Sequence, residues 1–451
     1  MKTGWKSEAW ARLLCLLCLL LPLVILFLLP SGNMIGGIGW FWLVLLLCFV
    51  MSWMMLGRPS NEEEPTAACH MDTEEPEFRT LTVDESPDVV ADVMHVRLAT
   101  ESDGVRIFRG PLHVSGQEAF ERLEHEFGDN SVPLVQKDEQ FGSAIVLMPK
   151  AVEEATMERP VRWWLHGLLF GLTILTTTLA GAAHQGLNLL EEPAKFAVGL
   201  PYAIGLLLIL GLHELGHYFA ARLHGMNVTP PFFIPVPFGL GTFGAFIQMR
   251  SPSQSRRALF DVAVAGPLAG LVVAIPALLI GLQSSTVLVE APAAGHMTGG
   301  TSVGSSLLFA AVSKLALGDA LEFGHNVQLS PLAFAGWLGL LITALNLLPI
   351  GQLDGGHIAR AVFGHRTGSA ISSIAMWSLF LLALFVWPGL MMWAILVFFM
   401  AGRPTPPLND VTDLNPIRKG LGYVSFAILA VILLPLPHAF WSSVGIHCPY
   451  L

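Results

Sequence analysis

The sequence predicts an all-α polytopic membrane protein of about eight or nine transmembrane helices, with a small membrane-embedded β-hairpin and a small cytoplasmic α+β domain. Of its 451 residues, 53% are hydrophobic and only 13% are charged, whereas soluble chains average about 25% charged residues. The apolar residues also gather in runs of about the 20 residues that a membrane helix needs. This composition excludes a plain soluble enzyme and a disordered chain. The net charge of −10 argues against a nucleic-acid partner, whose phosphates favour a basic surface.

Seven apolar runs are each predicted to cross the membrane once, and an eighth, residues 371–401, is too long for one upright helix. Pro388 stands in the middle of the eighth run, between Trp387 and Gly389. This predicts either a helical hairpin or one helix kinked at the proline. The apolar segment 305–318 is short and is expected to lie at the membrane interface. The seven runs are residues 13–30, 36–56, 163–182, 194–217, 258–281, 331–353 and 421–441.

The basic residues predict the orientation, because short cytoplasmic loops carry an excess of Lys and Arg. With the N-terminus in the cytoplasm and a hairpin at 371–401, the external loops hold only Lys195 and Lys314 of the 24 basic residues. Ten others lie in the long 58–162 segment, where the rule is weak, so the rest divide 12 to 2 in favour of the cytoplasm. The loops 222–257 and 403–420 are therefore expected on the cytoplasmic side.

The soluble part of the chain falls between the second and third runs. Residues 58–90 are acidic and poor in aromatics, which indicates a linker. Residues 91–161 are expected to form the α+β domain, with strands over 105–108 and 143–148 and a helix over 115–127 capped by Ser115. The predicted division is two N-terminal helices (1–57), linker (58–90), α+β domain (91–161), membrane core (162–402), and a cytoplasmic loop with the last helix (403–451).

The residues that indicate chemistry lie in the fourth run, which ends in His213-Glu214-Leu215-Gly216-His217. On a helix, residues four apart project from one face, so His213 and His217 can share one Zn²⁺. Glu214 would then lie beside the open metal position, where it can take a proton from water. The alternative interpretation is a cytoplasmic helix end where polar side chains simply meet water. A polar triplet within a membrane span is costly unless it is functional, which favours the metal site.

A zinc site needs a third protein ligand, and two aspartates are candidates. Asp261 and Asp354 are expected at similar depths, so depth does not distinguish them. Pro349 and the glycines around Asp354 interrupt its helix and free the backbone to turn the carboxylate toward a metal. Asp261 is followed by a regular apolar helix and is favourable at a helix N-terminus without any metal. The surroundings therefore favour Asp354.

Two separated motifs carry a resemblance to a known family. The HELGH motif at 213–217, together with Asn346-Leu-Leu-Pro349-Ile-Gly-Gln-Leu-Asp354-Gly355, resembles the site-2 protease family of intramembrane zinc metalloproteases. The similarity covers roughly residues 163–420. Within the family the chain looks closest to the branch known from chloroplasts and cyanobacteria, to which residues 232–252 and 256–270 are similar.

The resemblance implies an intramembrane zinc metalloendopeptidase that takes part in regulated intramembrane proteolysis. It implies Zn²⁺ as cofactor, His213, His217 and Asp354 as its ligands, Glu214 as the catalytic acid and base, and a role for Asn346 near the reacting carbonyl. The expected partners are single-span membrane protein substrates and the lipid bilayer. Because two N-terminal spans stand where chloroplast members carry a transit peptide, a bacterial inner membrane is expected. The alternatives are a catalytically inactive scaffold and a transporter-like protein.

The segment that follows the metal helix is predicted to hold the substrate. Four prolines between 230 and 237 forbid a regular helix, and residues 242–249 alternate in the manner of a strand. An unwound substrate could add to this strand as a further strand beside the zinc. The substrate-binding residues are then expected to be Thr242, Phe243, Gly244, Ala245 and Phe246. The alternative is a hairpin that only plugs the site, since edge strands are usually protected.

Overall fold

The computed structural model describes residues 79–81, 87–102, 104–149, 161–288, 306–318, 326–385, 390–400 and 406–434. Several expectations lie outside these residues: the N-terminal spans at 13–30 and 36–56, most of the acidic linker, the 387–389 tip, and the end of the last apolar run. The described part is mostly helical, with small antiparallel sheets.

Five helices of the described part are long and apolar enough to cross a membrane. These are α6 (Trp163–His184), α7 (Leu200–Leu223), α8 (Arg256–Gln283), α12 (His365–Phe385) and α14 (Pro416–Leu433). The shorter apolar helices α9 (Leu307–Leu317) and α10 (Pro331–Leu347) pack beside α8. The chain is therefore a multi-pass membrane protein, although these five candidate spans are fewer than the eight or nine predicted for the whole chain.

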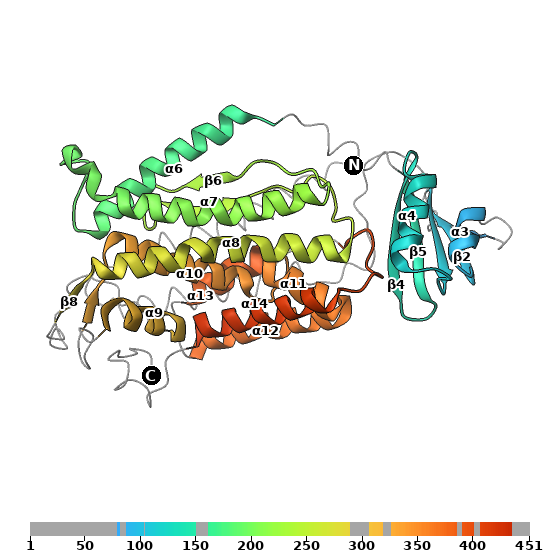
Figure 1. Ribbon diagram of the computed structural model, residues 1–451. Coiled ribbons are helices and arrows are strands. Elements are labelled where there is room, and N and C mark those ends of the chain that lie inside the picture. The colour runs from blue at the N-terminus through green and yellow to red at the C-terminus, as the bar shows by residue number, and fades with distance from the viewer. Residues whose placement is uncertain are drawn as a thin grey trace, which may run out of the picture. The chain divides into compact units, whose positions relative to one another are not determined.

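The centre of the membrane part is α8, which packs against both α7 and α10 (Figure 1). One apolar cluster joins α8 to α9, α10, α14 and the short helix α11 (Asp354–Phe363). A second cluster joins α6, α7 and α10 and includes Tyr202, Leu206 and Phe233. Helix α7, which carries the metal motif, contributes Ile209 to the first cluster and Leu206 and Leu210 to the second.

The long run at 371–401 folds back on itself. It forms α12 and α13 (Leu390–Met400), and the rings of Phe380 and Phe398 lie 6.1 Å apart. Eighteen residues of one continuous helix would separate these rings by about 27 Å at 1.5 Å per residue. The run is therefore a helical hairpin and not one kinked helix.

The predicted fourth and sixth spans differ from the observed helices in their limits. A 3-10 turn, η2 (Pro193–Val198), precedes α7, and α7 continues to Leu223, so the HELGH residues lie inside the helix and not at its end. The helix predicted over 331–353 stops at Leu347, and Asp354 begins α11 instead of ending α10. Pro349 cannot donate a helical hydrogen bond and Gly351 has φ +50°, which together explain the break.

Two short sheets lie beside the membrane helices. Strands β6 (Phe232–Pro235) and β7 (Thr242–Phe246) form an antiparallel hairpin with a bulge, next to α6 (Figure 1). Strands β8 (Thr286–Leu288) and β9 (Asn326–Gln328) form the second pair. The hairpin was predicted, but its second strand ends at Phe246 and not at residue 249. Gly244 has φ +105°, which breaks the regular alternation. Strand alternation would place Phe243 and Phe246 on opposite faces, and both are exposed.

The part of the chain before α6 forms an antiparallel sheet of five strands in the order β1-β2-β3-β5-β4. Helix α4 begins at the predicted cap, where the Ser115 hydroxyl accepts a hydrogen bond from the Glu118 N–H. Val135 of β4 exchanges backbone hydrogen bonds with Leu408 and Asp410 in the loop before α14. The elements are β1 (Arg79–Leu81), α3 (Asp88–Val93), β2 (Leu98–Ser102), β3 (Val105–Gly110), α4 (Gly116–Phe127), β4 (Ser131–Asp138) and β5 (Gly142–Pro149).

Candidate metal centre

Three side chains from two helices converge on one point. His213 and His217 project from one face of α7, and Asp354 projects from the first residue of α11. The Asp354 Oδ2 atom lies 3.4 Å from Nε2 of His213 and 3.3 Å from Nε2 of His217. Among the residues that the structure describes, these three form the one group whose donor atoms could together hold a metal ion, with no two atoms more than 4.8 Å apart.

The geometry of this group fits zinc. Tetrahedral zinc binds nitrogen and oxygen at about 2.0–2.2 Å, which places neighbouring donors about 3.3–3.6 Å apart. The two nitrogen-to-oxygen separations fall in this range. Two imidazoles and one carboxylate also leave a fourth position open, as catalytic zinc sites require.

The histidines and the glutamate of the motif are buried, which contradicts the alternative of a solvated helix end. His213 is 3% exposed, and Glu214 and His217 are each 7% exposed. The backbone of Ile247, just beyond β7, lies close to the Glu214 carboxylate. The residue predicted to move protons therefore lies between the metal-binding group and the hairpin.

Backbone contacts fix the place of Asp354. A Cβ added at Gly355 would overlap the carbonyl of Leu347, and one added at Gly356 would overlap the carbonyl of Gly351. The start of α11 therefore lies directly against the end of α10. Only glycine permits this turn, which brings the Asp354 carboxylate under α7.

Asn346 lies at the edge of the metal-binding group. Its side-chain Nδ2 is 3.2 Å from Nε2 of His213, the nitrogen that faces Asp354. Asn346 is in the last turn of α10, so α7, α10 and α11 each contribute a polar group to the same small volume.

The five predicted hairpin residues form β7, which packs against α7. Thr242 is buried and Phe243 is 72% exposed.

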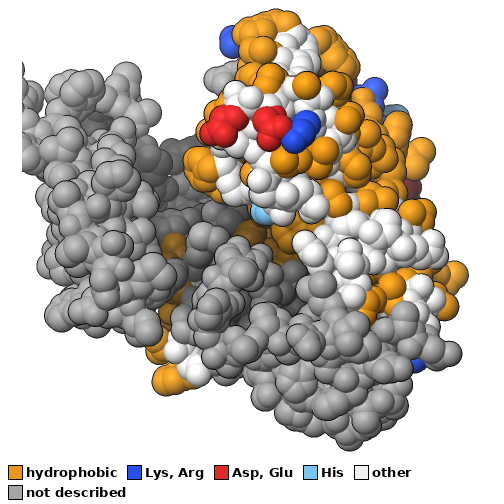
Figure 2. Space-filling model, turned by 90° about the vertical axis from the view of Figure 1, so that its left-hand side faces the viewer, with side chains coloured by type: hydrophobic (Ala, Val, Ile, Leu, Met, Phe, Trp, Pro, Cys, Tyr) orange, Lys and Arg blue, Asp and Glu red, His pale blue; other side chains and the backbone are white. Residues whose placement is uncertain are grey.

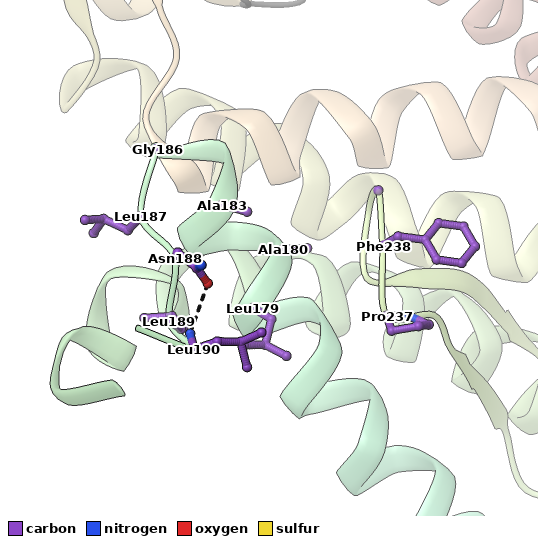
Figure 3. Close-up of a pocket in the computed structure, with 11 residues that line it drawn as sticks. Leu179, Ala180, Ala183, Gly186, Leu187, Asn188, Leu189, Leu190, Pro237 and Phe238 are labelled. Atoms are coloured by element: carbon purple, nitrogen blue, oxygen red, sulfur yellow. Dashed lines mark hydrogen bonds between the residues drawn. The ribbon is translucent and has the colours of Figure 1, made fainter. Parts of the chain in front are cut away.

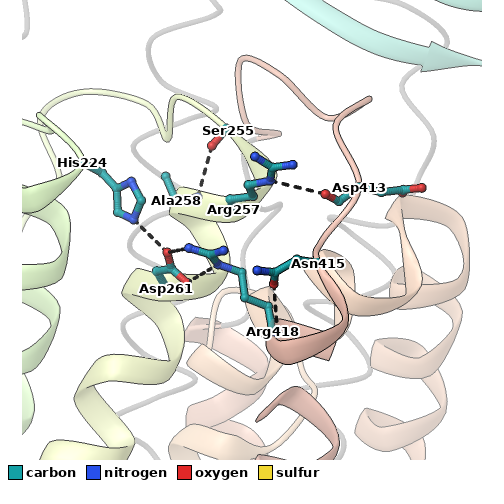
Figure 4. A network of polar contacts seen from close by, with 8 residues as sticks. All are labelled: His224, Ser255, Arg257, Ala258, Asp261, Asp413, Asn415 and Arg418. Atoms are coloured by element: carbon teal, nitrogen blue, oxygen red, sulfur yellow. Dashed lines mark hydrogen bonds and ion pairs between the residues drawn. The ribbon is translucent and has the colours of Figure 1, made fainter. Parts of the chain in front are cut away.

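Asp261, the other candidate ligand, belongs to a different network (Figure 4). Arg418 of α14 donates hydrogen bonds of 2.7 Å to both Asp261 carboxylate oxygens. The Nε2 atom of His224, at the C-terminal end of α7, lies 3.0 Å from Oδ2 of the same carboxylate. The network ties the ends of α7, α8 and α14 together, and it accounts for Asp261 without a metal.

Sequence reasoning missed the groups of α8 that hold the two histidines. The carbonyl oxygen of Val262 lies 2.8 Å from Nδ1 of His217. Gly266 and Gly270 lie against the rings of His217 and His213. The spacing of four between these glycines, equal to the spacing of the histidines, is the signal that could have revealed them.

A separate cavity of about 440 Å³ lies between the end of α6 and the turn of the hairpin (Figure 3). Mostly apolar residues line it, and Asn188 accepts a hydrogen bond from the Leu190 N–H at its wall. It contains none of the metal-binding residues. Among the described side chains visible in Figure 2, most are hydrophobic or uncharged and few are charged. In the η2 region, Lys195 forms an ion pair with Glu192.

Comparison with known proteins agrees with this geometry. The sequence model of peptidase family M50 matches residues 201–386. The Arabidopsis thaliana protein named "Probable zinc metalloprotease EGY1, chloroplastic" is 32% identical over 377 residues, which cover 75% of this chain and 68% of the relative. The chain belongs to peptidase family M50, the site-2 protease family.

Other relatives within the M50 family carry similar names. "Probable zinc metalloprotease EGY2, chloroplastic" of Arabidopsis thaliana is 32% identical over 358 residues, covering 76% of this chain and 62% of the relative. The EGY1 protein of Oryza sativa subsp. japonica is 35% identical over 380 residues, covering 75% and 64%. The chain thus spans about three-fifths of the length of these EGY2 and rice EGY1 relatives. No solved structure matches the chain. In this M50 chain, His213, His217 and Asp354 form the group whose donor atoms could hold a metal ion.

Proposed function

We propose that this M50 chain is an intramembrane zinc endopeptidase, which hydrolyses peptide bonds of single-span membrane proteins near the cytoplasmic face in regulated intramembrane proteolysis. The observation that carries the proposal is the convergence of His213, His217 and Asp354 within the membrane helices, with Glu214 buried beside them. A scaffold that only binds helices needs no general base, and this favours the enzyme over the inactive alternative. A transporter-like protein does not need three metal-ligand atoms so close together, and this favours the enzyme over the transporter alternative.

Glu214 is proposed as the catalytic acid and base. When bound, zinc supplies Lewis acidity and lowers the pKa of water to about 7. Glu214 accepts the proton of the attacking water and returns it to the leaving amine, help that is worth about 10²–10⁴-fold in rate. The buried position of Glu214 excludes bulk water from competing for that proton.

Asn346 is proposed to stabilise the reacting carbonyl. Its Nδ2 lies beside the metal-facing nitrogen of His213, so a carbonyl placed at the open metal position comes within reach of the amide N–H. A donor aimed at a developing oxyanion is worth about 10²–10³-fold in rate. The amide carries no charge, so it can donate at any pH at which the enzyme works.

Residues 242–246 are proposed to bind the substrate as an added strand. A helical substrate must unwind before cleavage, and broken backbone hydrogen bonds in lipid cost several kcal/mol unless they are replaced. Among the described residues, β7 pairs with β6 alone, which leaves its other edge for a substrate. The Gly244 N–H already donates to Thr242 Oγ1 at 3.0 Å, so the substrate would bond to other residues of the strand.

The proposed topology has eight or nine spans with the N-terminus in the cytoplasm. Five described helices qualify, and α10, the α13 arm of the hairpin and the two N-terminal runs supply the rest. We propose that four helix ends face the cytoplasm, because each of them carries an arginine. These are the ends at Arg222 of α7, Arg256 of α8, Arg360 of α11 and Arg418 of α14. The 91–161 domain and the 162–402 core are proposed as predicted, except that β1 (Arg79–Leu81) of the predicted linker belongs to the sheet of the domain because it pairs with β2. A bacterial inner membrane stays the predicted location.

The proposal is tested with the purified full chain in lipid vesicles that also contain single-span membrane peptides. We expect cleavage within or near the span, loss of cleavage after the metal is removed with a chelator, and recovery when zinc is added back. Bound zinc without cleavage of any membrane peptide would favour the scaffold, and absence of bound zinc would contradict the site itself.

A further inference from the structure

The two helices α7 and α8 meet with matched spacings. His213 and His217 are four residues apart on α7, and Gly270 and Gly266 are four residues apart on α8. Gly266 faces His217 and Gly270 faces His213, so the two helices run in opposite directions across the contact. Residues four apart lie above one another on a helix face. One face of α8 thus presents one glycine to each metal-binding histidine.

The contact at Gly266 is with the histidine ring itself. A Cβ added there would overlap Nε2, Cε1 and Cδ2 of His217, and these are its three nearest atoms. This is the ring edge that faces Asp354, because the same Nε2 lies 3.3 Å from the Asp354 carboxylate. Any side chain at 266 would displace the ring or cover its ligating nitrogen.

The opposite edge of the same ring is held by the same helix. Val262, one turn before Gly266, places its carbonyl oxygen 2.8 Å from Nδ1 of His217. A carbonyl at this position requires Nδ1 to carry the proton and leaves Nε2 for the metal. One turn of α8 therefore sets both the position and the tautomer of His217.

General helix packing does not account for Gly266. Gly216 is the packing glycine of this crossing, since its added Cβ would lie 2.6 Å from the Ala265 carbonyl oxygen and 3.0 Å from the Ala269 Cβ. Gly281, at the far end of α8, would meet the backbone of Ala333. Glycine is unfavourable in a helix interior relative to alanine, and at 266 the ring gives the reason for it.

We propose that Gly266 is a positioning residue for the metal-binding histidine His217, acting together with the Val262 carbonyl. The proposal concerns metal binding and rests on the metal site within the proposed function. Its tests measure zinc binding and unfolding, not cleavage. A failure of this proposal can therefore be distinguished from a failure of the proposed proteolysis.

The first test compares zinc affinity of the full chain in detergent for a graded series of variants. Gly266→Ala should weaken zinc binding about 100-fold or more, the upper range for loss of a group that orients a ligand. Gly270→Ala should weaken it about 10-fold at most, because its added Cβ would lie 3.2 Å from His213 Nδ1, where a small shift suffices. Gly171→Ala in α6 meets nothing within 4 Å and should leave zinc binding unchanged. Zinc affinity of Gly266→Ala equal to that of the wild type would overturn the proposal.

The second test keeps the proposal open to refutation if Gly266→Ala folds poorly. Thermal unfolding is measured with a chelator present, for Gly266→Ala in the natural chain and in a His217→Ala background. If the ring is the cause, the substitution lowers the unfolding temperature only where the ring is present. Gly281→Ala should lower it equally in both backgrounds, because its contact is with Ala333. An equal loss for Gly266→Ala in both backgrounds would show that it serves helix packing and would overturn the proposal.

Discussion

Arg418 donates two hydrogen bonds of 2.7 Å to the carboxylate of Asp261. Both oxygens of this carboxylate are thereby used, and His224 approaches one of them as well. Asp354 instead directs its Oδ2 between the two histidines of α7. The two aspartates, which the sequence predicts at similar depths, therefore have different roles. Asp261 pairs with Arg418 and His224, and Asp354 belongs to the metal-binding group.

This division predicts opposite results for two alanine variants. Asp354→Ala should lose the bound zinc, because two imidazoles alone do not complete a tetrahedral site. Asp261→Ala should keep one zinc per chain but unfold more easily, by about 1.5–3 kcal/mol for a lost hydrogen bond to a charged group. Zinc content and thermal unfolding of the two purified variants decide this, and loss of metal from the Asp261 variant alone would refute the ligand assignment.

Asn346→Ala should slow cleavage without removing zinc. If the Asn346 amide donates to the reacting carbonyl, its loss should lower the cleavage rate by about 10²–10³-fold. The measurement is the single-turnover rate with zinc content determined in the same samples. If the variant loses zinc, Asn346 instead holds His213 in place, and the proposed role at the carbonyl fails.

Proline substitutions at 245 and 246 should separate strand addition from a plugging hairpin. Neighbouring residues of an antiparallel strand direct their N–H groups to opposite sides, and Ala245 and Phe246 pair with Phe233 and Phe232 of β6. One proline should therefore disturb the hairpin, and the other should impair only cleavage. Position 244 is unsuitable, because φ +105° there is incompatible with proline.

The decisive observations are zinc content and unfolding temperature beside the cleavage rate for each proline variant. Strand addition requires that one of the two retains zinc and wild-type stability yet cleaves slowly. If both variants lose stability alike, or both cleave normally, the outer edge of β7 does not hold the substrate.

The proposed orientation predicts which loops a membrane-impermeant thiol reagent reaches from outside intact cells. In a chain without its native cysteines, Leu190→Cys in the loop after α6 should be labelled, and Gln254→Cys before α8 should not. Both side chains are exposed in the structure, so accessibility in the folded protein is comparable. Labelling of Gln254→Cys alone would reverse the orientation.

Much of the site could be predicted because its chemistry is local in the sequence. His213 and His217 are four residues apart on one helix, so helix periodicity alone brings them together. The break near Asp354 was predicted from Pro349 and the glycines, and the structure shows α10 ending at Leu347. The hairpin after the metal helix was foreseen for the same reason, since prolines forbid a helix there.

The remaining features depend on contacts between distant segments. The Val262 carbonyl has no side-chain signature, and Gly266 has meaning only once α7 and α8 are packed together. The length of β7 was overestimated because the left-handed backbone at Gly244 cannot be deduced from apolar alternation. The hairpin at 371–401 was one of two possibilities until the contact between Phe380 and Phe398 distinguished them.

The proposed proteolysis is tested most directly by single-turnover cleavage of a membrane-spanning peptide by Glu214→Gln, with zinc measured in the same preparation. Glutamine nearly preserves the size of the side chain but cannot accept the proton. We expect one zinc per chain and a cleavage rate lowered by about 10²–10⁴-fold or more. Cleavage at the wild-type rate by the zinc-loaded variant would contradict the proposed role of Glu214 and with it the mechanism.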